Sequence, residues 1–133
     1  MELGIRSETT SMETISKVEY GKKSFLVFRR NKYFIVPTEK IAFFYTRNES
    51  TIIVGSDRQE YTVNYSLEHI QNMLSDEQFY RLNRQYIVNF NAVKEVEHYF
   101  ARKLLVNLTI PVAEKLLVSK EKSTHFLRWL GNR

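Results

Sequence analysis

Short apolar runs separated by polar turns place the strongest constraint on the fold of this chain. They occupy residues 25–28, 33–36, 41–45, 52–54, 60–64, 93–99, 104–109 and 116–118. Runs of this length, rich in β-branched and aromatic residues, are typical of strands, and their spacing favours an all-β fold decorated with helices. Pro37 is expected to end the second strand, because proline has no N–H to donate to a ladder.

Two segments have helical spacing instead. Residues 67–74 place apolar side chains on one face of a helix, and Ser66 precedes them as a suitable N-cap. A second helix is expected over residues 120–130, with Ser119 as its N-cap and Gly131 ending it at the C′ position.

The domain organisation follows from length and composition. A chain of 133 residues, 43% of them hydrophobic and 14% aromatic, is long enough for one domain with a buried core. Residues 1–23 are predicted to be a linker, a tail or an expression remnant, with residues 14–20 ambiguous between helix and strand. Residues 24–133 form the predicted domain.

Several classes of protein are disfavoured by what the sequence lacks. It has no cysteine, which excludes disulfides and thiolate chemistry, and it has no apolar run long enough to span a bilayer. Its three histidines have no ligand spacing, and no catalytic motif stands out. We therefore expect a cytoplasmic protein that is not an enzyme and has no metal, cofactor, small-molecule substrate or membrane partner.

Positive charge is concentrated in the C-terminal part of the chain. Residues 1–78 hold 10 Lys and Arg against 11 Asp and Glu, a net of −1, whereas residues 79–133 hold 10 against 4, a net of +6. A basic half is the electrostatic footprint of a nucleic-acid binder, although a merely basic surface gives the same count.

The stretch from Phe79 to Asn89 is the centre of the functional argument. It is expected to be a short strand, a polar loop at residues 83–85, and a second strand that buries residues 86–88. A loop anchored at both ends can hold long polar side chains towards a partner. Arg84 is the foremost candidate, because its planar fork matches both phosphate and the edge of guanine.

This stretch resembles the signature of the LytTR DNA-binding family, which is found at the C-terminus of many bacterial response regulators. Arg81, Arg84 and residues 86–89 match the family pattern, whereas Asn83 and Gln85 replace its usual His and Ser. The resemblance implies a mainly β, elongated fold of small, mostly antiparallel sheets with one internal helix and a C-terminal helix.

The resemblance also implies that three loops reach DNA, at residues 46–51, 83–85 and 118–120. The predicted base contacts are Arg84, Lys120, Thr51 and Asn83. The predicted backbone contacts are Arg47, Asn48, Ser50, Gln85, Ser119, Lys122 and Ser123, of which the first three are also alternatives to Thr51. Arg81, Tyr86 and Asn89 are predicted to support the loops.

The expected function is sequence-specific binding of double-stranded DNA through the major groove, as the output domain of a bacterial transcriptional regulator. The resemblance further implies two protomers on repeated half-sites. A protein-interaction or dimerisation module with a basic face is the alternative, and nonspecific binding of single strands or RNA is a third. The aromatic pairs at residues 43–44 and 99–100 are expected in the core or on a dimer surface.

Overall fold

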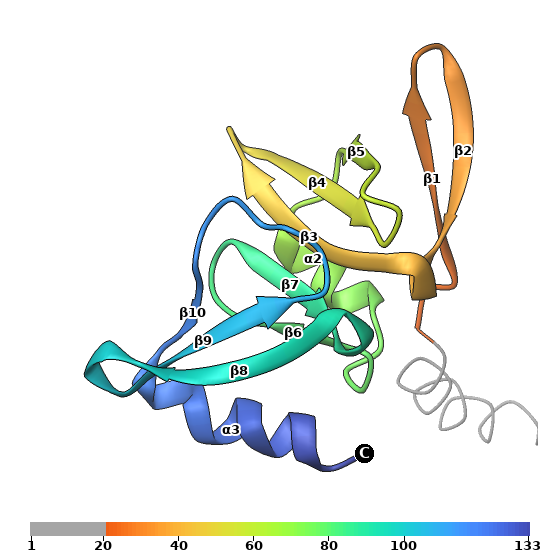
Figure 1. Ribbon diagram of the computed structural model, residues 1–133. Helices are drawn as coiled ribbons and strands as arrows, with labels where there is room; N and C mark the ends of the chain where they lie inside the picture. Colours follow the sequence, from red (N-terminus) through yellow and green to blue (C-terminus); the bar gives the residue numbers. More distant parts are fainter. Residues whose placement is uncertain (1–20) are drawn as a thin grey trace, which may run out of the picture.

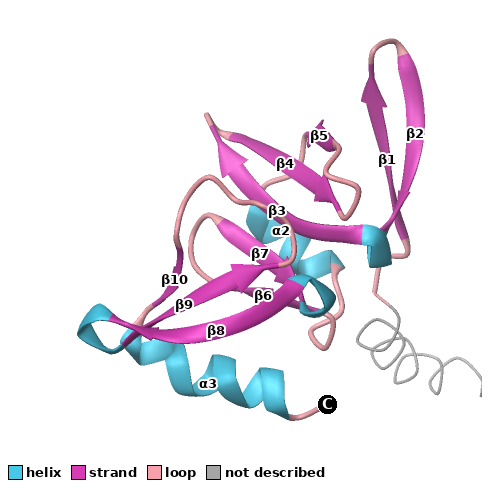
Figure 2. Ribbon diagram, viewed as in Figure 1, coloured by secondary structure: helices cyan, strands magenta, loops and turns pink. Residues whose placement is uncertain are grey.

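The computed structural model describes residues 21–133, which fold into three antiparallel sheets and two α-helices (Figures 1 and 2). The expectations for residues 1–20 lie outside the described residues. This mainly β architecture confirms the predicted fold class. Within the described range, no helix is long and apolar enough to cross a membrane.

The largest sheet has five strands in the order β5-β4-β3-β7-β6. Its strands are β3 (Ile41–Arg47), β4 (Ser50–Gly55), β5 (Glu60–Val63), β6 (Phe79–Arg81) and β7 (Tyr86–Asn89). The internal helix α2 (Leu67–Met73) connects β5 to β6, and the Ser66 hydroxyl caps it by accepting a hydrogen bond from His69 N. The strand, loop and strand expected between Phe79 and Asn89 are confirmed as β6, its loop and β7.

A three-stranded sheet of order β10-β9-β8 carries the C-terminal helix. It consists of β8 (Val93–Tyr99), β9 (Lys103–Leu108) and β10 (Leu116–Val118), and α3 (Lys120–Gly131) follows directly. Figure 1 shows α3 running alongside this sheet. Phe126 is the fully buried anchor of the helix. The helix includes Gly131 and ends at the Asn132 cap, so the prediction that Gly131 is C′ was wrong by two positions.

The third sheet is a separate hairpin of β1 (Ser24–Arg29) and β2 (Lys32–Pro37) that projects from the body in Figure 1. One face of it packs on the body, where Phe25 and Val27 are buried. Short 3-10 turns at Thr38–Lys40, Phe90–Ala92 and Phe100–Arg102 join other strands. Pro37 ends β2, as expected.

Two hairpin turns among the described residues are made without glycine. The turn between β8 and β9 has Ala101 at φ 59° and Arg102 at φ 62°, and the turn between β3 and β4 has Asn48 at φ 52° and Glu49 at φ 67°. Positive φ at two successive residues suits the twist of a hairpin, at about 1 kcal/mol for each non-glycine residue. Phe100, in the first of these turns, is 80% exposed, so of its two expected places, the core or a dimer surface, the core is excluded.

Candidate nucleic-acid interface

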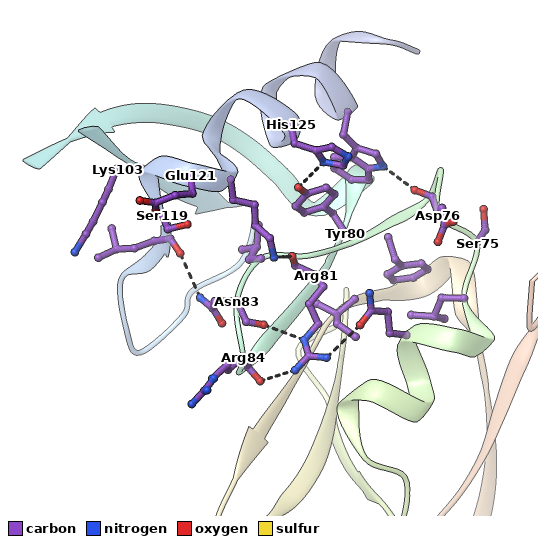
Figure 3. Close-up of a pocket in the computed structure, with 18 residues that line it drawn as sticks. Ser75, Asp76, Tyr80, Arg81, Asn83, Arg84, Lys103, Ser119, Glu121 and His125 are labelled. Atoms are coloured by element: carbon purple, nitrogen blue, oxygen red, sulfur yellow. Dashed lines mark hydrogen bonds between the residues drawn. The ribbon is translucent and has the colours of Figure 1, made fainter. Parts of the chain in front are cut away.

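Arg81 fixes the loop between β6 and β7. Its Nε donates to Asn83 O at 2.9 Å, Nη2 donates to Arg84 O at 2.9 Å, and Nη1 donates to Gln71 Oε1 at 3.1 Å (Figure 3). The guanidinium therefore joins both ends of the loop to helix α2. These bonds to carbonyl oxygens are the contacts of a supporting residue, the role that the sequence predicted for Arg81.

Asn83 holds the same loop from inside. Its Oδ1 accepts hydrogen bonds from Gln85 N at 2.8 Å and Tyr86 N at 3.0 Å, and its Nδ2 donates to Leu117 O at 3.3 Å. Both ends of the amide are thus used within the protein. These bonds favour a supporting role for Asn83 over the predicted contact with bases, since its oxygen and one of its two Nδ2–H groups are used within the protein.

The three predicted loops are bonded to one another. Thr46 N, at the end of β3, donates to Gln85 O at 3.1 Å. On the other side, the Asn83 amide reaches β10, and the Lys122 ammonium donates to Arg81 O at 3.0 Å. The loop between β6 and β7 therefore lies between the other two and sets their relative position.

Two cations at these loops remain unpaired. Arg84 and Lys120 are exposed, and neither side chain makes a hydrogen bond or ion pair with any residue between 21 and 133. Only the carbonyl of Arg84 is used, by Arg81, and Figure 3 shows its side chain directed away from those bonds. An arginine whose backbone is fixed and whose guanidinium group has no partner is suited to bind a phosphate or the edge of a guanine.

The loop between β3 and β4 corrects another prediction. Thr51 is 3% exposed and pairs with Thr46 and Val63 inside the sheet, so a base contact by Thr51 is contradicted. Asn48 is exposed at the turn, and Ser50 is half-buried. They are the remaining candidates there.

Arg47 belongs to the same loop but is already paired. Its guanidinium lies 3.7 Å from the Glu60 carboxylate and over the Tyr45 ring, with 55% of its side chain exposed. An ion pair this exposed is worth less than about 1 kcal/mol, so a phosphate can compete for Arg47.

The start of α3 is partly as expected. Ser119 occupies the N-cap position, but its hydroxyl makes no capping hydrogen bond and is exposed. Ser123 Oγ donates to Ser119 O at 2.8 Å, four residues back in its own helix, which makes a phosphate contact by Ser123 a poor assignment. The amides of the first turn remain free to meet an anion.

Lys122 faces inward rather than towards solvent. Its Nζ bonds Arg81 O and lies 5.8 Å from the centre of the Tyr80 ring. Burial, and secondarily the nearby Arg81 charge, lowers the pKa of this ammonium below its ordinary 10.5. Lys122 therefore supports the loop between β6 and β7, and its contact with the DNA backbone stays a prediction.

Buried anchors lie behind the loops. The Tyr86 ring is buried and its hydroxyl donates to Glu114 Oε1 at 3.1 Å. Asn89 is 2% exposed; its Nδ2 donates to Ile41 O at 2.8 Å, and its Oδ1 accepts from Asn91 N at 2.9 Å. Both residues fix the second strand on which the loop ends.

A groove of about 1210 Å³ runs from these loops between α2 and α3 (Figure 3). Lys103 lies on its wall with Ser119 and Arg84, and sequence reasoning missed it. The basic pair Arg102 and Lys103 at the start of β9 was the available signal. Deeper in the groove, Tyr80 Oη and His125 Nδ1 are hydrogen-bonded at 2.8 Å.

Comparison with known families decides the identity of this arrangement. A family model described as the LytTr DNA-binding domain matches residues 31–131. The chain belongs to this LytTr family. DNA binding is therefore the activity of the domain, and a catalytic function is not one that the family carries.

A solved structure shares the LytTr fold. It is a LytTr DNA-binding domain from Bacillus cereus, described as part of a methyl-accepting/DNA response regulator. The two chains are 23% identical with a TM-score of 0.72, and the match covers 84% of this chain and 99% of the other. No curated protein matches the chain.

Proposed function

We propose that this LytTr domain binds double-stranded DNA sequence-specifically, through the loops at residues 47–50, 83–85 and 119–120. The observation that carries the proposal is the hydrogen bonding of the middle loop to both of its neighbours. Loops fixed in this way present exposed side chains at constant spacing. Constant spacing is what reading base edges in a groove requires.

Arg84 is the base-reading residue of the middle loop in this proposal. Its fork can donate two hydrogen bonds to guanine O6 and N7. Lys120 contacts a base or phosphate as a point charge, and Asn48 or Ser50 serves from the first loop. Phosphates are bound by Gln85, by Ser119 with the α3 amides, and by the missed Lys103.

The biological setting is part of the same proposal. The solved relative is described as part of a response regulator, and the basic excess of this chain lies in residues 79–133, which carry two of the three loops. We infer that the domain spans residues 24–133 and acts in the cytoplasm as the output of a bacterial signalling pathway. Two protomers bind repeated half-sites.

Binding of Arg84→Ala to duplex DNA tests the assignment. Loss of the fork is expected to weaken binding to the preferred sequence by about 1–3 kcal/mol and to relax the preference at one position. Arg128→Ala is the matched control, because it removes an exposed arginine of the same charge from the last turn of α3, away from the three loops. Equal affinity and sequence preference for Arg84→Ala and the unsubstituted protein would contradict the role of Arg84.

A further inference from the structure

The outer face of the β1–β2 hairpin is apolar and uncovered. It consists of three cross-strand pairs, none of them charged: Ser24 with Pro37, Leu26 with Ile35, and Phe28 with Tyr33. Their four large side chains are exposed by 53–71%, and residues 21–133 contain only three other exposed large hydrophobics. The exposure is thus concentrated on one face of one element.

The inner face of the hairpin is fully used by the fold. Phe25 and Val27 are buried in the core, and Arg29 donates to Glu60 O and Gln59 Oε1, both at 3.0 Å. The hairpin is therefore fixed in place, and its outer face does not turn inward. Its strands read as continuous apolar runs, which is the pattern of a sheet covered on both sides.

Another strand of the same chain shows how an uncovered face is normally built here. In β8, the exposed positions carry Lys94, Glu95, Glu97 and His98. The exposed positions of β8 are thus polar, whereas the exposed positions of β1 and β2 are apolar apart from Lys32 at the tip of the hairpin. The difference indicates that another apolar surface covers the hairpin.

We propose that this outer face binds the same face of a second copy of the chain. The face carries no charge, so it selects an apolar partner rather than an acidic or basic one. It also tapers, because the aromatic pair lies at one end and Ser24 and Pro37 lie at the other. A two-fold axis across the strands places the large pair of one copy on the small pair of its partner.

This symmetry puts Leu26 and Ile35 at the centre, where each faces its counterpart in the other copy. The basic tips around Arg30 and Lys32 then lie at opposite ends and do not meet. Face-to-face packing of two sheets about 10 Å apart allows such side chains to interdigitate.

The available area fits a weak dimer. With aromatic side chains of about 150–250 Å² each, the four exposed side chains offer roughly 500 Å² per copy, or about 1,000 Å² in all. This lies at the lower limit of specific interfaces. For an interface of this size we expect weak association, to be sought in the micromolar range.

The outer face of the hairpin contains none of the proposed DNA-contacting residues. Figure 1 shows the hairpin on the side of the domain away from the start of α3. Its inner face is nearer to the first loop, because Arg29 bonds Glu60, the ion-pair partner of Arg47. The inference therefore stands apart from the proposed DNA function, and either can fail without the other.

Sedimentation equilibrium of the full chain across the micromolar range tests the dimer. The unsubstituted protein is expected to dimerise, and Leu26→Lys to weaken the dimer roughly tenfold or more by placing two ammonium groups together. Leu127→Lys, at another exposed hydrophobic residue, is the control and should dimerise normally. Because Leu26 is 65% exposed, its replacement should leave thermal unfolding unchanged at concentrations low enough for both proteins to be monomeric.

Mixing Leu26→Lys with Leu26→Glu provides the sharper test. If Leu26 of one copy faces Leu26 of the other, the opposite charges of the two variants should restore dimerisation in the mixture. Each variant alone should dimerise only weakly. A protein that is monomeric throughout would overturn the inference. So would a dimer that is insensitive to Leu26→Lys, or a mixture that fails to restore association.

Discussion

Replacing Asn83 by alanine separates the geometry of the central loop from its contacts with DNA. The Asn83 Oδ1 accepts from the amides of Gln85 and Tyr86, so its removal takes the hydrogen-bond partner from both. The net loss for each such bond is about 0.5–1.5 kcal/mol. We therefore expect Asn83→Ala to destabilise the domain by roughly 1–3 kcal/mol.

Urea unfolding measures this loss directly. A decrease of about 2 kcal/mol lowers the unfolding midpoint by roughly 1 M for a domain of this size. Asn83→Asp is the comparison variant: its carboxylate keeps the acceptor for both amides but faces the Leu117 carbonyl without a donor, so it should recover only part of the stability. Arg84→Ala removes only an exposed side chain and should change stability by less than about 0.5 kcal/mol.

The two variants should therefore differ in kind. Asn83→Ala loses stability together with DNA affinity, whereas Arg84→Ala loses affinity alone. If Asn83→Ala kept its full stability but lost sequence preference, Asn83 would be a base-reading residue after all, and the supporting role given to it would be refuted.

Two further predictions concern the anchors behind the loops. Asn89→Ala should cost roughly 2–4 kcal/mol in urea unfolding, because Ile41 O and Asn91 N lose their buried partner; a loss below 1 kcal/mol would contradict this. Burial, with the Glu114 hydrogen bond, raises the pKa of Tyr86 above its ordinary 10.0. Above about pH 10 this tyrosine ionises in the unfolded chain but not in the folded domain, so the domain loses stability as the pH rises. Tyr86→Phe should make stability fall less steeply between about pH 9 and pH 11, and equal slopes would exclude this linkage.

Much of the fold was predictable because its strands are short apolar runs with clear ends. Pro37 ended its strand as expected, and Ser66 capped its helix. The turn at Ala101 and Arg102 could not be predicted, since neither residue favours a positive φ and the sheet imposes it.

The candidate site was predictable at the level of segments and less so at the level of side chains. Thr51 lies one residue inside β4, and a shift of one position decides whether a strand residue is buried or exposed. Lys122 was expected to point outward, but the Arg81 carbonyl and the Tyr80 ring hold it inside. The direction in which a side chain points depends on contacts between segments far apart in the sequence.

Selection from a randomised duplex pool, run at two salt concentrations with the unsubstituted chain and with Arg84→Ala, tests the central claim most directly. Sequence-specific reading predicts an enriched motif of two spaced repeats that persists at the higher salt. It also predicts that Arg84→Ala relaxes one position in each repeat. Binding without any enrichment, lost at the higher salt, would contradict sequence-specific recognition and leave only a basic surface.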